Sequence, residues 1–193
     1  RSTGLTGSLS DMLSAYVFSS VTPVTDGMTL TASWVTRGTA YSTLGNASAA
    51  SVRVDATIAN TDTGILMEAG GSSIGLALYA FNGVLYFQCG DGSSFAAGTS
   101  RASLSYTLPV GTITPIIEWS ANTSNAVLYI DGIEVDSQTF TESAIAGNDA
   151  GTIGRVVSFA AVNRGGWESN GEGDYTNAIT KCDIFLNQVT SDV

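Results

Sequence analysis

The sequence contains no histidine, and this absence excludes whole classes of chemistry. Without an imidazole the chain cannot build a Ser-His or Cys-His nucleophile pair, nor a histidine-ligated metal site. Charged residues are also scarce, at 12% of 193 residues, and 17 acidic against 7 basic side chains give a formal net charge of −10. With no basic stripe the chain repels nucleic acid and anionic membranes, so we expect neither as a partner.

Cysteine is almost as rare, with two residues in the whole chain. Cys89 and Cys182 both lie in strand-like runs, where a disulfide and two buried free thiols are both compatible with the pattern. A chain of this length buries enough surface to be stable without a disulfide. No apolar run is long enough to span a membrane. Because the first residue is Arg1 and not methionine, we expect the chain to be a processed or excised piece.

Apolar residues and glycines are plentiful, at 44% of the chain and 22 residues respectively. Together with many Thr, Ser and Val residues, this composition is typical of short strands joined by tight turns. No linker, low-complexity tract or internal repeat interrupts it. Residues 1–193 are therefore predicted to form a single domain.

Apolar and polar residues alternate with a period of two along most of the chain, which predicts strands. From residue 51 to residue 58, for example, Val52 and Val54 fall on one side and Arg53 on the other. The one helix predicted is Ser10–Phe18. Further strands are predicted at Met28–Val35, Gly64–Ala69, Ile74–Ala80, Val84–Cys89, Ala102–Leu108, Thr114–Trp119, Ala126–Ile130, Ile133–Phe140, Gly151–Val157, Ser158–Val162 and Ala178–Asn187.

Two dipeptides, Asn82-Gly83 and Asp131-Gly132, predict tight hairpins. Each separates two apolar strand-like runs, and each tolerates the positive φ values that a two-residue type I′ turn requires. Asn60-Thr61-Asp62 and Gly90-Asp91-Gly92 are also interpreted as turns. Many short strands with hairpins and no intervening helices favour an all-β fold, a two-sheet antiparallel jelly-roll β-sandwich.

The order of these pieces resembles laminin-G-like and concanavalin-A-like domains over nearly the whole chain. The matching segments are Leu30–Val35, Thr63–Met67, Gly75–Leu78, Asn82–Phe87, the hairpin from Ile116–Trp119 to Val127–Gly132, Thr152–Arg155, and Tyr175 through Leu186. The resemblance implies a concanavalin-A-like sandwich. That fold hosts lectins, receptor modules, glycosidases and capsid parts, so it does not by itself define a function.

The resemblance also implies a calcium site, which such domains often hold at one rim with an Asp just before a central strand. Here Ser72-Ser73 occupy that place, so the usual site is in doubt. A second possibility is the loop WESNGEGDY, where Glu168, Glu172 and Asp174 offer oxygen ligands between glycines, as Asn170 does. Calcium is thus a possible cofactor, and a solvated acidic loop is the alternative interpretation.

The same loop is a candidate for ligand binding. Arg164, Trp167, Asn170 and Tyr175 place two aromatic rings beside polar groups on a glycine-rich connection. Aromatic rings stack on the apolar faces of sugars while Asn and Arg meet hydroxyls, and exposed loops on rigid scaffolds commonly carry such sites. The alternative is that Trp167 folds back over the core. By contrast, Trp34 and Trp119 lie within strands and are predicted to be core residues.

A glycosidase would require two carboxyl groups flanking the scissile bond. The retaining enzymes on this fold carry Glu-x-Asp-x-x-Glu on one strand, and no such motif is present. The nearest approach is Glu134-Val135-Asp136, where we expect both acids on the solvent face, opposite Ile133 and Val135. The chain is therefore predicted not to be an enzyme, and a glycan hydrolase or lyase is the least favoured of three alternatives.

The favoured function is a non-catalytic recognition module that binds a glycan or a surface protein, with calcium as a possible aid. The second alternative is a structural or decoration protein of a virus or phage particle. It rests on low charge density and Ala/Ser/Thr-rich strands, and it implies a homo-oligomer or virion assembly. In both cases we expect the domain to be extracellular or exposed at a cell or particle surface.

Overall fold

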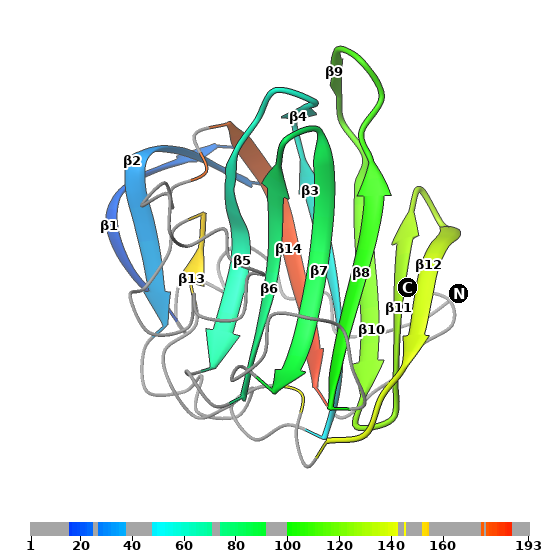
Figure 1. Ribbon diagram of the computed structural model, residues 1–193. Coiled ribbons are helices and arrows are strands. Elements are labelled where there is room, and N and C mark those ends of the chain that lie inside the picture. Colours follow the sequence, from blue (N-terminus) through cyan, green and yellow to red (C-terminus); the bar gives the residue numbers. More distant parts are fainter. Residues whose placement is uncertain are drawn as a thin grey trace.

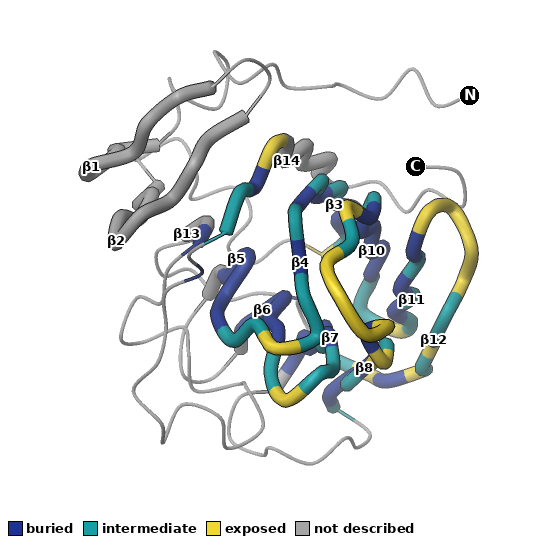
Figure 2. Tube along the Cα trace, turned by 90° about the horizontal axis from the view of Figure 1, so that it is seen from above, coloured by how far each residue is buried: buried dark blue, intermediate teal, exposed yellow. Residues whose placement is uncertain are grey.

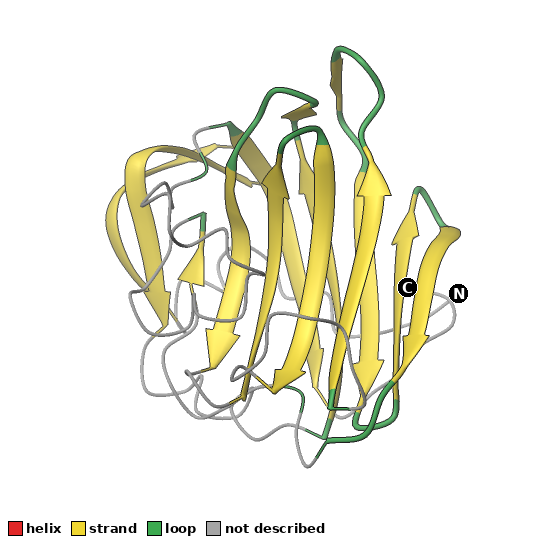
Figure 3. Ribbon diagram, in the orientation of Figure 1, coloured by secondary structure: helices red, strands yellow, loops and turns green. Residues whose placement is uncertain are grey.

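The structure is a computed structural model, and it describes residues 16–24, 27–37, 48–70, 74–91, 100–142, 145, 152–154, 175 and 177–186. Every regular element in this part of the chain is a β-strand, as Figure 3 shows, and all pairings are antiparallel. The all-β prediction is confirmed. Within these residues no helix is long and apolar enough to cross a membrane.

The strands form two facing layers (Figures 1 and 2). The first layer contains β5 (Gly64–Gly70), β6 (Ile74–Phe81), β7 (Val84–Asp91) and β8 (Arg101–Thr107). The second contains β14 (Ala178–Leu186), β3 (Ala49–Ala56), β10 (Ile116–Asn122), β11 (Asn125–Ile130) and β12 (Ile133–Thr139).

The two layers are parts of one continuous hydrogen-bonded sheet that is bent on itself. Its order is β12-β11-β10-β3-β14-β2-β13-β5-β6-β7-β8, so that β2 (Gly27–Arg37) and β13 (Thr152–Ile153) join the layers. β1 (Tyr16–Val24) pairs with β2, and β4 (Ile58–Ala59) pairs with β9 (Thr112–Ile113) as a separate two-stranded ribbon.

Both predicted hairpins are confirmed. Asn82 and Gly83 join β6 to β7 with φ of 50° and 79°, and Asp131 and Gly132 join β11 to β12 with φ of 52° and 78°. Two consecutive positive φ values define the type I′ turn, whose twist matches that of the flanking strands. The turn at Asn60–Asp62 is also present, since the Asp62 amide donates to the Ala59 carbonyl at 3.0 Å.

The core lies between the layers and is centred on Trp119 of β10. Its ring stacks on Phe87 of β7, with centroids 4.4 Å apart and planes 18° from parallel. Both side chains are fully buried, as predicted for Trp119. The alternation predicted at residues 51–58 is confirmed as well, because Val52 and Val54 are buried. The side chain of Trp34, in β2, lies outside the described part of the structure.

The predicted helix at Ser10–Phe18 is wrong for the residues that the structure describes. Tyr16–Phe18 begin β1, which pairs with β2 along its length, Tyr16 opposite Arg37. The segment YVFSSVTPV is rich in β-branched and aromatic residues, and pairing with a neighbouring strand outweighs any local helical preference. Gly90 and Asp91, interpreted above as a turn, instead lie in β7.

Cys89 is a free thiol in the core. Burial raises its pKa to about 12, against the opposing effect of the Arg101 charge. A protonated, inaccessible thiol behaves as a small apolar side chain. Of the two alternatives drawn from the sequence, the structure therefore supports the free thiol for Cys89, while the Cys182 side chain in β14 lies outside the described residues.

Candidate functional site

The outer face of the first layer carries an apolar cluster that is separate from the core. One row of cross-strand partners runs across β5, β6, β7 and β8, and its members are Ile65, Tyr79, Tyr86 and Ser105. Paired residues of antiparallel strands point to the same side of a sheet. Ile65, Ala77 and Tyr79 form the buried part of this cluster, with Phe81 and Tyr86 packed against it.

A β-bulge places Ile65 on this face. The register of β5 against β6 shifts between Ile65 and Met67, so Leu66 is an additional residue. As a result Leu66 and Met67 both enter the main core, while Ile65 joins the outer cluster. A bulge inserts one residue and changes the phase of the alternation beyond it.

The aromatic rings of the cluster are held in a fixed arrangement. Tyr79 and Tyr86 stack with centroids 5.0 Å apart and planes 20° from parallel. Tyr79 is only 3% exposed, whereas Tyr86 and Phe81 are half-buried, and the neighbouring Ser105 is exposed. We name Phe81, Tyr79 and Tyr86 the aromatic platform. Rings fixed in this way offer apolar contact area at low entropic cost, beside hydroxyl groups able to donate and accept.

The next rows of the same face are polar and buried. Arg101 Nη2 donates to Gln88 Oε1 at 2.5 Å, and Gln88 Nε2 donates to Ser103 Oγ at 2.9 Å. Glu68 lies in the same row as Gln88, through its partner Ala77. Glu68, Gln88 and Arg101 are at most 4% exposed, so the face changes from buried polar groups to half-buried rings toward the Asn82-Gly83 turn.

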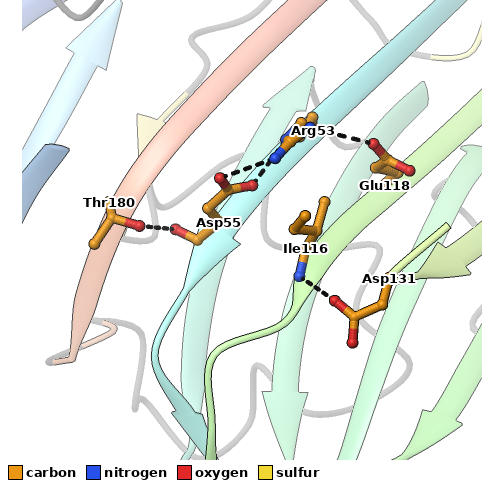
Figure 4. A network of polar contacts seen from close by, with 6 residues as sticks. All are labelled: Arg53, Asp55, Ile116, Glu118, Asp131 and Thr180. Carbon is orange, nitrogen blue, oxygen red and sulfur yellow. Dashed lines mark hydrogen bonds and ion pairs between the residues drawn. The ribbon is translucent and has the colours of Figure 1, made fainter. Parts of the chain in front are cut away.

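The outer face of the second layer is charged (Figure 4). Arg53 of β3 forms a bidentate pair with Asp55, Nε to Oδ1 at 2.9 Å and Nη2 to Oδ2 at 3.2 Å, and approaches Glu118 of β10 at 4.0 Å. At its edge Asp131 Oδ1 accepts from the Ile116 amide at 2.9 Å. The Arg53 guanidinium thus lies between the carboxylates of Asp55 and Glu118.

Glu118 is only 3% exposed. Burial raises its pKa, the nearby Arg53 lowers it, and Asp55 and Asp131 raise it further. A glycosidase needs two carboxyl groups facing one bond, whereas here Asp55 is held by Arg53. Among the described residues, no group of three Cys, Asp or Glu side chains is placed to hold a metal ion.

We expect Glu118→Gln to change how stability depends on pH. Because the folded-state pKa of Glu118 is raised, the folded protein holds this proton more tightly than the unfolded chain. The Glu118 contribution to the free energy of unfolding therefore falls as pH rises from about 4.3, the ordinary value, through the folded pKa. The variant lacks this decline. Urea denaturation should therefore show that its free energy of unfolding, relative to that of the wild type, rises between pH 4 and pH 7.

The control for that experiment is Glu134→Gln, which alters an exposed glutamate of β12. This variant removes a glutamate that is not among the charges acting on Glu118. A difference between Glu118→Gln and wild type that stays constant from pH 4 to pH 7 would show that Glu118 titrates alike in the folded and unfolded chains.

The predicted binding and metal-ligating residues lie almost entirely outside the described part of the chain: Arg164, Trp167, Glu168, Asn170, Glu172 and Asp174. Ligand and calcium binding by this loop stay predictions. Tyr175 is the exception, and the structure gives it a different role from the one predicted. It is 1% exposed, and its hydroxyl donates to the Thr57 carbonyl and lies 3.4 Å from Asp62 Oδ2. A ring buried to this degree packs in the core and does not face a sugar.

Asp62 explains why Tyr175 is drawn inward. Its Oδ2 also accepts from the Ala59 amide at 2.8 Å and from Asn177 Nδ2 at 2.7 Å. The carboxylate therefore ties the β4 turn to the segment that precedes β14. Burial, with Asp62 beside it, raises the pKa of the Tyr175 hydroxyl, which remains a donor.

Sequence reasoning did not identify the aromatic platform, although a signal was present. In LALYAF, Leu76 and Leu78 alternate with Tyr79 and Phe81 on the opposite side, and Tyr86 alternates with core residues in the next strand. Aromatic residues on the face opposite a regular aliphatic stripe were interpreted only as strand-forming residues.

Comparison with known proteins agrees with the architecture. The binding domain of botulinum neurotoxin serotype G superposes with a TM-score of 0.60 at 11% identity, covering 92% of this chain and 43% of that chain. The binding domain of botulinum neurotoxin DC in complex with SialylT gives 0.60 at 10% identity, covering 92% and 42%. Domains LG4-5 of the mouse laminin α1 chain give 0.47 at 16% identity, covering 75% and 37%.

The chain thus spans less than half the length of these similar structures. No protein-family profile matches the sequence, and no curated protein is similar to it in sequence. The fold is a two-layer antiparallel β-sandwich like that of these toxin binding domains, as the sequence predicted. At these identities the likeness defines the fold alone.

Proposed function

We propose that this domain is a non-catalytic recognition module that binds a glycan through the aromatic platform on the outer face of the first layer. The observation that carries this proposal is the pair of half-buried rings, Phe81 and Tyr86, held against a buried and stacked Tyr79. Strand-borne rings keep their orientation without a ligand, which reduces the entropy lost on binding.

Hydroxyl groups beside the rings suit a sugar better than a purely apolar ligand. Ser105 is the cross-strand partner of Tyr86, and Thr107 is the partner of Val84 one row further along. Both residues are exposed. A pyranose ring has apolar faces and a rim of hydroxyls, so rings flanked by hydroxyls match its two kinds of surface.

A binding role also agrees with the second layer. Arg53 is placed between Asp55 and Glu118, so neither acid is arranged as one of a pair across a bond. The structurally similar toxin domains are named as binding domains. Surface exposure of this domain, outside a cell or on a particle, is part of the proposal. The role in a virus or phage particle stays a prediction.

The test is a glycan array followed by calorimetry, with wild type, Phe81→Ala and Tyr86→Ala. We expect each substitution to weaken binding of any glycan found by roughly tenfold or more, because each removes a stacking ring. The matched control is Tyr129→Ala, which removes a half-buried tyrosine from the outer face of the second layer. Unchanged affinity in Tyr86→Ala, or equal losses in Tyr129→Ala, would refute the location.

The calcium question is answered in the same experiment by an arm with EDTA. If Glu168, Glu172 and Asp174 hold calcium that supports the ligand, chelation lowers binding and added calcium restores it. If EDTA does not change the affinity, calcium plays no part in binding. The proposal that the aromatic platform binds the glycan is then retained without calcium. No binding to any glycan, with or without calcium, would overturn glycan recognition itself.

A further inference from the structure

The two strands at the ends of the sheet order, β8 and β12, meet at one side of the sandwich. They have no backbone ladder between them among the described strands. Side chains of β12 instead bond to the backbone of β8. The Ser105 amide donates to Asp136 Oδ2 at 2.8 Å, and the Ser103 amide donates to Gln138 Oε1 at 2.9 Å. Gln138 Nε2 in turn donates to the Arg101 carbonyl at 3.2 Å.

These are the backbone groups that an edge strand normally leaves open. One hydrogen-bonding edge of β8 is paired with β7 from Arg101 to Thr107. Its outward amides at Ser103 and Ser105, and its carbonyl at Arg101, are those that a further strand would use. Asp136 and Gln138 thus replace a neighbouring strand with two side chains at alternate positions, matching the two-residue repeat of the β8 edge.

A β-bulge in β12 makes this possible. The register of β12 against β11 shifts so that Leu128 opposes Asp136 while Tyr129 opposes Glu134, which leaves Val135 as the additional residue. Asp136 therefore shares the face of Leu128, a core residue, and is directed inward to β8. The expectation that Glu134 and Asp136 both lie on the solvent face, opposite Ile133 and Val135, is confirmed for Glu134 and Val135 but was wrong for Asp136 and Ile133. Ile133 is 69% exposed, and Val135 packs against the core.

The same side of the sandwich is closed at its other end by an apolar contact. Phe140, just after β12, is 4% exposed and lies over Gly90 of β7. A Cβ placed on Gly90 would meet Phe140 Cε2 at 3.4 Å. The polar pair and this ring together close the gap between the layers along β8.

We infer that Asp136 and Gln138 form a clasp that closes the β8 edge against strand addition by a second copy of this chain. An exposed edge with unpaired amides and carbonyls is a template for pairing with another strand. Identical edges of two copies pair antiparallel about a two-fold axis, which makes a second copy the partner always available. Neither clasp residue belongs to the aromatic platform, although Asp136 binds the amide of Ser105, whose hydroxyl flanks the rings.

The experiment compares wild type with Asp136→Ala, Gln138→Ala and the double variant, by amide hydrogen exchange and sedimentation. We expect the Ser105 amide to exchange roughly tenfold faster in Asp136→Ala while Ser103 stays protected, and the converse in Gln138→Ala. The double variant should sediment as a larger species than wild type as concentration rises. Asp136→Asn keeps an acceptor oxygen, so it should retain protection at Ser105.

The matched control is Ser137→Ala with Thr139→Ala, which changes exposed residues on the other face of β12. It should behave as wild type in both measurements. Unchanged exchange at Ser103 and Ser105 in the single variants would overturn the clasp. Faster exchange in the double variant without increased association would overturn the role in blocking a second copy. If the double variant does not fold, the position-specific exchange of the single variants and sedimentation of Gln138→Ala decide both points.

Discussion

Replacing Trp119 by alanine is expected to destabilise the domain by about 3–5 kcal/mol. The side chain is fully buried, it is the largest fully buried side chain among the described residues, and it stacks on Phe87 across the two layers. Its removal leaves a cavity that the facing strands cannot fill without moving closer together. Urea denaturation monitored by circular dichroism should show a lower midpoint, and the melting temperature should fall by roughly 10 °C.

Trp119→Phe serves as the control because it keeps a ring in the stack. The indole Nε1 has no hydrogen-bond partner among the described atoms, so its loss removes a buried donor whose desolvation is not repaid. We therefore expect the phenylalanine variant to lose less than half as much stability as the alanine variant. A cost below about 1 kcal/mol for Trp119→Ala would show that the layers do not depend on this contact.

Gly90→Ala is expected to cost about 3 kcal/mol or more, although it adds a single methyl group. Gly90 has a φ of +106°, which side chains rarely adopt, and an added Cβ would lie 2.5 Å from the Ser100 carbonyl oxygen. That oxygen belongs to the backbone leading into β8, so it cannot move without shifting the strand. Denaturation by urea measures the loss directly.

Gly132→Ala separates the backbone strain of a positive φ from the steric clash of an added Cβ. This glycine also has a positive φ, +78°, but nothing lies within 4 Å of an added Cβ. Only the backbone strain should appear, at about 1–2 kcal/mol. If the two variants lost equal stability, the close approach of Ser100 to Gly90 would carry no energy of its own.

The strands and hairpins were predictable because their signals are local. Alternation marked the strand around Val52 and Val54, and Asn-Gly and Asp-Gly dictate a turn type whatever their surroundings. The side-chain directions in β5 and β12 were not predictable. Bulges at Leu66 and Val135 reverse the phase within each strand, and a bulge is set by the partner strand.

The site predicted from the sequence lies on a loop outside the described residues, so it stays a prediction. Reasoning from the sequence placed it on the glycine-rich loop around Trp167, because exposed loops often carry ligands. The aromatic platform instead follows from Tyr79 and Tyr86 being cross-strand partners on a face opposite the core. Sequence alternation identifies two faces, but only the pairing of strands decides which rings lie together. Tyr175 was misjudged for a related reason, since its partner Asp62 is distant in sequence.

The position of β14 in the sheet affects how the polypeptide folds during its synthesis. β14 is the furthest along the sequence of the described strands, yet it is inserted between β2 and β3 near the middle of the sheet. Until it emerges from the ribosome, those two earlier strands each lack a neighbour, and the sheet stays divided. Sheets completed by a late, sequence-distant strand form slowly and expose apolar surface meanwhile. Nascent chains of this protein should therefore depend on chaperone protection until β14 has left the ribosome and paired with β2 and β3.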